Sequence, residues 1–147
     1  MFLEALKSAK EWDHYRNLTK NNPIIIEKIN FNNDDLTDYD FQYCYFKYCT
    51  FEKTTLHGTN FRNSIAYKCS FKDAKFWHTC FEGFDARSCL FTDIPINCWM
   101  ENTILSPSQI RLLKRYLDKF KEEPRQEFTE EYADGLYKKI WNDPANF

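Results

Sequence analysis

Apolar residues occupy every fifth position from residue 26 to residue 96, without an exception. The series is Ile26, Phe31, Leu36, Phe41, Phe46, Phe51, Leu56, Phe61, Ala66, Phe71, Phe76, Phe81, Ala86, Phe91 and Ile96. Neither an α-helix, with its period of 3.6, nor a flat strand, with its period of 2, places apolar residues in this way. The period of five therefore predicts a structural repeat that covers about half of the chain.

The residue two positions before each apolar residue is usually small, and the residue two positions after it is often Asn, Asp or Gly. Such residues favour turns. Each five-residue unit thus contains two inward side chains and a corner, which predicts a square coil of twenty residues and about four coils over residues 24–105. The predicted core comprises Phe31, Phe41, Phe46, Phe51, Phe61, Phe71, Phe76, Phe81 and Phe91, with Cys44, Cys49, Cys69 and Cys89 at small inward positions.

These units resemble those of the pentapeptide-repeat family. Thr59-Asn60-Phe61 and Cys69-Ser70-Phe71 each combine a small residue, a variable outward residue and a central Phe. The resemblance covers residues 24–105 and implies a mainly β solenoid, namely a right-handed quadrilateral β-helix. It implies little about activity, because one fold can serve many functions.

Helical patterns flank the repeats, and we expect them to cap the open ends of the solenoid. Residues 2–18, within an N-terminal cap of residues 1–23, have the apolar spacing of one helix. In the C-terminal segment, residues 106–147, Ser106 and Gln109 predict a capping box that starts a helix extending past Phe120. A last helix is predicted over residues 126–142. These two helices either only cap the solenoid or also form a dimer or partner surface.

Charge and hydropathy narrow the function. The chain has 20 basic and 22 acidic residues, whereas a nucleic-acid-binding protein normally has a basic excess. No apolar stretch is long enough to span a membrane, and charged residues interrupt the first segment as they would not in a signal peptide. We therefore expect a cytoplasmic protein with reduced thiols and no direct contact with nucleic acid or membrane.

The cysteines offer little catalytic or metal chemistry. Cys49, Cys69 and Cys89 are twenty residues apart and should stack in one column, where they cannot surround a single ion. His78 and Cys98 are also twenty residues apart, so the coil predicts that they are outward neighbours. A pair of this kind could act as base and nucleophile, but no orienting third group or pocket accompanies it. We expect no enzyme activity, no cofactor and no metal.

Outward aromatic residues suggest an interaction surface, because exposed Tyr and Trp often anchor protein interfaces. The candidates are Tyr43, Tyr45, Tyr48, Tyr67 and Trp77. Tyr45 should align with Ile25 and Ile65 in an apolar outward strip. Either a partner binds this strip or a terminal helix folds back over it.

A second candidate surface is acidic and belongs to the first coil. It comprises Asp34, Asp35, Asp38 and Asp40. Our primary interpretation is a protein-interaction module with an unidentified protein partner. The family resemblance implies an alternative, because some members mimic DNA, bind type II topoisomerases and protect them from quinolones or other poisons. The repeat region contains 11 acidic and 8 basic residues, which is a weak excess for a DNA mimic.

Overall fold

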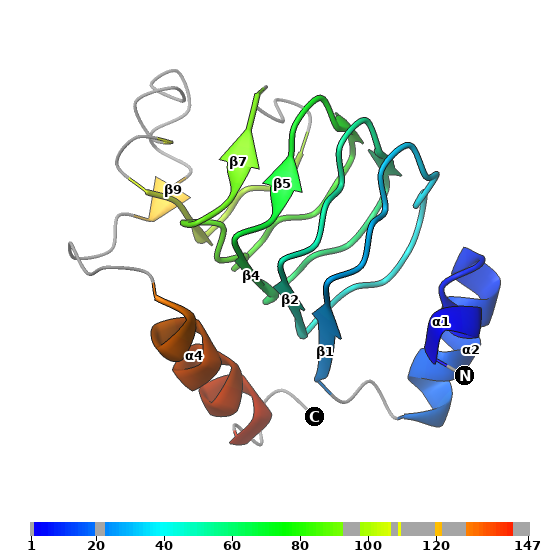
Figure 1. The fold of residues 1–147 in the computed structure, drawn as a ribbon, viewed down its shortest axis with the longest axis horizontal. Coiled ribbons are helices and arrows are strands. Elements are labelled where there is room, and N and C mark those ends of the chain that lie inside the picture. The colour runs from blue at the N-terminus through cyan, green and yellow to red at the C-terminus, as the bar shows by residue number, and fades with distance from the viewer. Residues whose placement is uncertain are drawn as a thin grey trace.

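The computed structural model describes residues 2–19, 23–92, 98–106, 109, 120–121 and 129–142. Its centre is a parallel β-solenoid, in which each short strand pairs with the strand one coil later (Figure 1). The strands are β1 (Ile24–Glu27), β2 (Cys44–Lys47), β3 (Thr55–His57), β4 (Ile65–Tyr67), β5 (Ser70–Phe71), β6 (Lys75–Trp77), β7 (Leu90–Phe91), β8 (Thr103–Ile104) and β9 (Phe120–Lys121).

The pairing register follows the predicted twenty-residue coil. Ile25 pairs with Tyr45, and Tyr45 pairs with Ile65, in the sheet β1-β2-β4. The sheets β3-β6 and β5-β7 form two further sides, while the fourth side is joined by isolated bridges such as Asn60 to Cys80. The four sides of the square thus each have their own column of paired strands or bridges.

The coil count is lower than predicted, with about three turns instead of four. The last described coil is also one residue shorter, because Cys80 pairs with Trp99 and Asp85 pairs with Ile104. Met100 and Leu105 are buried in this coil, one position earlier than a strict period of five requires. The predicted core position Ile96 lies outside the described residues.

Phenylalanine rings stack in columns through the centre of the solenoid. The ring centroids of Phe31 and Phe51 are 4.9 Å apart, and those of Phe51 and Phe71 are 4.7 Å apart. This spacing equals the separation of neighbouring strands, so each coil adds one ring to the column. The buried predicted residues are Phe31, Phe41, Phe46, Phe51, Phe61, Phe71, Phe81, Cys44, Cys49, Cys69 and Cys89. Phe76 and Phe91 differ from the prediction, since they are only partly buried and pack against the rim of this core.

The small inward residues also form hydrogen bonds. Thr59 Oγ1 donates to the carbonyl oxygen of Leu36 at 2.7 Å, and Thr79 Oγ1 donates to that of Leu56 at 2.6 Å. Ser64, Thr54 and Thr103 make the equivalent bond to the preceding coil. These bonds explain why polar Thr and Ser are buried: each hydroxyl is paired with a backbone carbonyl.

Thr59→Val tests this contribution, because valine keeps the shape of threonine and removes the hydroxyl. We expect the free energy of unfolding to fall by about 1 kcal/mol, the usual net value of one buried hydrogen bond. Thr55→Val, at an outward position on β3, is the matched control and should change stability by less than about 0.5 kcal/mol. Equal urea midpoints for the two variants would contradict a stabilising role for the inward hydroxyls.

The corners have left-handed backbone conformations, which explains the turn-forming residues two positions after each apolar residue. Asp38 has a φ of 63° and Gly58, one coil later, has a φ of 68°. A Cβ atom on Gly58 would lie 2.3 Å from Oδ1 of Asp38. Glycine at position 58 therefore leaves room for the side chain of Asp38 and also adopts the positive φ without strain.

Two short helices close the N-terminal end, where the sequence predicted one. They are α1 (Phe2–Ala5) and α2 (Ala9–Leu18). Ser8 separates them, because its side chain accepts a hydrogen bond from the backbone N–H of Glu11 and thereby caps α2. Trp12 of α2 is fully buried against the first coil, and its ring nitrogen donates to the carbonyl oxygen of Asp40.

The C-terminal segment begins with the predicted capping box. Ser106 Oγ accepts from the Gln109 backbone N–H at 3.2 Å, and Gln109 Oε1 accepts from the Ser106 N–H at 2.7 Å. Gln109 Nε2 also donates to the carbonyl oxygens of Ala86 and Cys89, so it satisfies the backbone of the last coil. The prediction that Phe120 continues a helix is wrong: it lies in β9, which pairs with β8.

The last helix, α4 (Glu130–Asn142), lies beside the sheet β1-β2-β4 (Figure 1). Residues 126–128, which the sequence also assigned to this helix, lie outside the described residues. No helix in the described parts of the chain has the length and apolar character that a membrane span requires.

Candidate functional site

The predicted aromatic strip is mostly covered by α4. Tyr45 is 1% exposed, and Ile65 and Tyr67 are also buried. Their contacts come from Ala133, Leu136 and Tyr137 of α4, and the rings of Tyr45 and Tyr137 lie 5.5 Å apart. The prediction that Tyr45 and Tyr67 form an exposed interaction surface is therefore wrong, and the alternative of a helix folded over the strip describes the structure.

Polar contacts fix α4 at the edge of this strip. Lys47 Nζ lies 2.6 Å from Oε1 of Glu130 and 3.4 Å from Oδ1 of Asp134. The hydroxyl of Tyr45 donates to Asp134 at 2.7 Å, and that of Tyr48 donates to Glu130 at 2.8 Å. The hydrogen bond from Lys47 is the main reason why the pKa of Glu130 lies below its usual value.

The remaining aromatic candidates differ in exposure. Tyr43 is half-buried at a corner, whereas Tyr48 and Trp77 are exposed. The hydrogen bond to Glu130 raises the pKa of Tyr48 to about 12, so the phenol stays protonated and acts as a donor at neutral pH. Tyr48 is thus partly engaged with α4, and Trp77 is the most exposed member of the predicted set.

Trp77 belongs to an exposed aromatic group at one corner, which we call the tryptophan patch and define as Trp77, His78 and Trp99. The rings of Trp77 and His78 stack at 4.9 Å, and those of His78 and Trp99 meet edge to face at 5.7 Å. Trp77 and Trp99 are each 51% exposed. The left-handed φ of 52° at His78 turns the chain between two sides of the square and places these rings at the corner.

The predicted neighbours His78 and Cys98 are not outward partners. Because the last coil is one residue shorter, Cys98 aligns with the inward Thr79 and packs against the core, whereas Trp99 aligns with Cys80, and its ring contacts His78 from there. Burial raises the pKa of the Cys98 thiol, which makes it a weaker nucleophile. The structure therefore does not place His78 and Cys98 as an outward pair of base and nucleophile. A strict period of five cannot reveal that one residue is missing from the last described coil.

The acidic candidates mostly support the turns of the first coil. Asp35 Oδ1 accepts from the backbone N–H of Thr37 at 3.0 Å, and Asp40 Oδ1 accepts from that of Gln42 at 3.1 Å. Asp38 occupies a corner and Asp34 is exposed. Asn30 and Asn60 make the same local bond as Asp35 and Asp40, so the bond depends on the oxygen atom and not on the charge.

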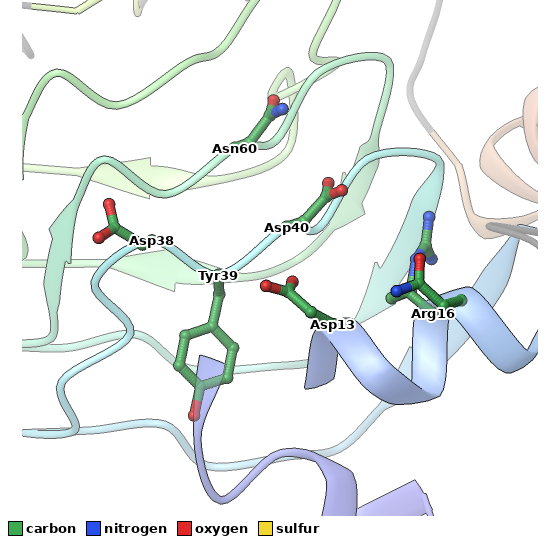
Figure 2. A pocket seen from close by; sticks show the side chains of 7 residues that line it. Asp13, Arg16, Asp38, Tyr39, Asp40 and Asn60 are labelled. Atoms are coloured by element: carbon green, nitrogen blue, oxygen red, sulfur yellow. The ribbon is translucent and has the colours of Figure 1, made fainter. Parts of the chain in front are cut away.

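A shallow pocket joins some of these acids to the N-terminal helices. Its lining includes Asp13 of α2 and Asp38, Asp40 and Asn60 of the solenoid, and Figure 2 shows Asp13 facing the loop that contains Asp38 and Asp40. Burial and, secondarily, the charges of Asp40 and Asp38 raise the pKa of Asp13. Asp13 could not be grouped with the first coil from sequence alone, because only the packing of α2 brings them together.

The thiols of the inner column donate to backbone carbonyls. Cys49 Sγ lies 3.2 Å from the carbonyl oxygen of Ile26, and Cys69 Sγ lies 3.5 Å from that of Phe46. Burial raises the pKa of Cys44 to about 12, and the pKa of Cys69 is also raised by burial. Within the described residues, no cluster of three or more His, Cys, Asp or Glu side chains has a geometry that suits a metal ion.

The comparisons with known proteins agree with this geometry. A family model described as "Pentapeptide repeats (8 copies)" matches residues 35–73. No curated protein matches the sequence significantly. The matched segment lies within the part of the solenoid that repeats every twenty residues, and strands outside it continue the same register. Residues 35–73 therefore consist of pentapeptide repeats, and the solenoid continues in the same register on both sides of them.

Proposed function

We propose that the chain is a non-enzymatic protein-interaction module that acts in the cytoplasm and binds a partner protein through the tryptophan patch. The observation that carries the proposal is the half-exposure of two indole rings, Trp77 and Trp99, on either side of His78. Tryptophan is among the residues most often found at the energetic centre of protein interfaces.

The position of the patch supports this role. Trp77 ends β6, whose register with β3 holds its backbone in place, and Trp99 is bridged to Cys80. A rigid backbone lowers the entropy that a surface loses on binding. The rings can therefore meet a partner without prior rearrangement of the chain that bears them.

The solenoid of this family is generally non-catalytic. The sequence suggested Cys98 as a nucleophile and His78 as its base. In the structure, Cys98 packs against the core, whereas His78 is exposed. A binding role needs only a stable, exposed surface, which the tryptophan patch provides.

Affinity capture from the native host provides the test. The full chain and the double variant Trp77→Ala/Trp99→Ala serve as baits, and quantitative mass spectrometry compares the captured proteins. We expect at least one protein to be captured by the wild type and depleted about tenfold or more with the variant, since an interface anchor contributes 2 kcal/mol or more.

Lys53→Ala/Lys72→Ala, on the neighbouring side of the solenoid, is the matched control, because both lysines are exposed and lie away from the patch. It should capture the same protein as the wild type. Identical captures by wild type and the tryptophan variant, with the variant folded, would contradict the proposed surface.

The DNA-mimic alternative predicts inhibition of DNA gyrase, and we expect none at micromolar protein. Duplex DNA presents one negative charge per about 1.7 Å of its axis. In this chain the acidic residues gather near the first coil. On the side formed by the sheet β1-β2-β4, the basic residues Lys47 and Arg87 interrupt any continuous negative charge. A supercoiling assay measures the effect; salt-sensitive inhibition that is weakened by neutralising Asp34, Asp35, Asp38 and Asp40 would contradict this expectation.

A further inference from the structure

We propose that acidification weakens the docking of a partner on the tryptophan patch, because His78 and His57 take up protons beside Trp77. The inference rests on the proposed function, since it concerns the regulation of the same surface. A partner that binds the patch equally well at every pH would leave the proposed function intact and exclude only this regulation.

Two of the three histidines of the chain lie next to the same exposed indole. His78 follows Trp77 at the corner and stacks on its ring, with a centroid distance of 4.9 Å and an interplanar angle of 13°. His57, one coil earlier, is paired with Trp77 in the register of β3 and β6. His78 is exposed and His57 is half-buried, so protons from solvent reach both rings. Histidine is the residue type that most often changes its charge between pH 5 and 8.

Proton uptake at His78 is compatible with the shape of the patch. A cation over the face of an indole is attracted by the ring, so a charged imidazole can keep its stack on Trp77. Strand pairing holds the backbone of Trp77, and a bridge to Cys80 holds that of Trp99. The switch therefore acts through the charge of the patch and not through a rearrangement of the chain.

The charged groups on the side of Trp77 have both signs. Lys75 lies two residues before Trp77 on the same face of β6 and is exposed. Asp35 lies near His57: hydrogen bonds from Thr37 are the main reason why the pKa of Asp35 is below its usual value, and His57 makes a smaller contribution. These charges offset each other in part, so the two histidines determine how the charge of this side changes with pH.

The side that bears Trp99 adds no further group that titrates in this range. Glu101 is exposed two residues after Trp99, and Glu82 pairs with Arg62 at 3.8 Å. Burial raises the pKa of the Cys80 thiol, which therefore stays neutral. Carboxylates and guanidinium groups ordinarily change little in charge between pH 5.5 and 7.5. The added positive charge at the patch thus comes from the histidines.

This added charge opposes docking. A partner that covers Trp77 and Trp99 also removes the imidazole of His78 from water, because both indoles contact that ring. Removing an unpaired charge from water costs far more than removing a neutral ring. Docking therefore favours the neutral ring, and affinity falls as the pH decreases through its titration. A bound state that accommodates only the neutral form loses about tenfold in affinity for each pH unit once the ring is charged in the free chain.

Ionic quenchers of indole fluorescence measure the charge of the patch without a partner. The full chain carries Trp141→Phe, so that quenching reports Trp77 and Trp99, since Trp12 is fully buried. From pH 7.5 to 5.5, the ratio of the iodide to the caesium quenching constant should rise about fourfold. One unit charge about 5 Å from an indole shifts each constant about twofold in opposite directions at physiological ionic strength.

The variant His57→Gln/His78→Asn should abolish this rise. Asparagine suits position 78, because it tolerates the left-handed φ of 52°. His14→Gln changes the third histidine, which lies on α2, and is the matched control. It should show the same rise as the wild type.

The release itself is measured on the protein that the wild type captures at pH 7.5 and that Trp77→Ala/Trp99→Ala does not. Bound complexes are washed at pH 7.5 or 5.5, and the retained protein is quantified. We expect retention by the wild type and by His14→Gln to fall about tenfold at pH 5.5. For His57→Gln/His78→Asn, retention at the two pH values should differ by less than about twofold.

Equal retention by the wild type at both pH values, or an unchanged quenching ratio, would overturn the proposal and leave the patch as a docking surface. Equal release from the wild type and from His57→Gln/His78→Asn would assign the pH dependence to the partner and would also overturn it. No capture that depends on Trp77 and Trp99 at pH 7.5 would contradict the proposed function itself, and this regulation with it.

Discussion

Phe61→Ala should lower the free energy of unfolding by about 3–5 kcal/mol, the range for truncation of a fully buried aromatic side chain. The ring of Phe61 lies between those of Phe41 and Phe81, at centroid distances of 5.6 and 5.5 Å. Its removal leaves a cavity that adjacent coils cannot close without shifting the strands that they share. Urea unfolding followed by circular dichroism measures the loss.

Leu90→Ala is a suitable control, because Leu90 lies on the same solenoid and is 55% exposed. Its effect should stay below about 0.5 kcal/mol. A small domain typically has a total stability of about 5–15 kcal/mol, so the Phe61 variant should be close to unfolding at physiological temperature. Equal midpoints for Phe61→Ala and Leu90→Ala would contradict the inward position of the fifth residue.

Trp12→Ala should destabilise the chain by a similar amount, about 3–5 kcal/mol, although Trp12 lies outside the repeats. Its ring contacts Phe41 at 5.4 Å and covers the N-terminal end of the phenylalanine columns. Its ring nitrogen is also a donor to the carbonyl oxygen of Asp40. Loss of the indole would expose the first coil to water, as expected for a solenoid without its cap.

Trp77→Ala is the matched control, since Trp77 is the same residue type in an exposed position. Thermal unfolding of the two variants should differ by many degrees, with Trp77→Ala near the wild type. Trp12→Phe should be intermediate, because it keeps an aromatic ring and loses the N–H donor. A Trp12→Ala variant as stable as Trp77→Ala would show that α2 does not cap the solenoid.

The repeat itself was predictable because each coil imposes the same requirement on every fifth residue. A large apolar side chain is needed at positions such as Phe61, and a small one at positions such as Thr59. The hydrogen bond of Thr59 to Leu36 was not predictable from size alone, because it depends on the coil before. The sequence did contain one sign of these hydrogen bonds, because Thr, Ser and Cys occur more often than Ala at the small inward positions.

The ends of the solenoid were harder to predict, because their structure depends on tertiary contacts. The apolar spacing of residues 2–18 fits one helix, yet Ser8 interrupts it by capping α2. Phe120 fits a helical stripe, yet the free edge of β8 pairs with it. Local pattern alone does not reveal which backbone groups at the end of a sheet need a partner.

The predicted aromatic surface differs from the exposed surface of the structure for a related reason. Tyr45 and Tyr67 have the outward positions that the repeat assigns to them, but α4 covers them. The contact joins residues 89 positions apart, such as Tyr45 and Asp134, and a repeat analysis contains no information on it. Trp99 was missed because a strict twenty-residue coil places it in the inward column of Thr79, whereas the one-residue shortening of the last coil moves it to the column of Cys80, where its ring contacts His78.

The coil register decides which side chains of the solenoid are exposed, and continuous-wave electron paramagnetic resonance of nitroxide pairs measures this register. One label is placed on the native Cys80 in a Cys98→Ser background, and the second is placed at Asn60→Cys, Trp99→Cys or Ser70→Cys. Labels at Asn60 and Trp99 should each show strong dipolar broadening with Cys80, because these residues are bridged across neighbouring coils about 4.8 Å apart. The label at Ser70, which lies ten residues away on the opposite side of the square, should show little. Broadening from Ser70, or none from Asn60, would contradict the twenty-residue coil and the exposed surfaces that follow from it.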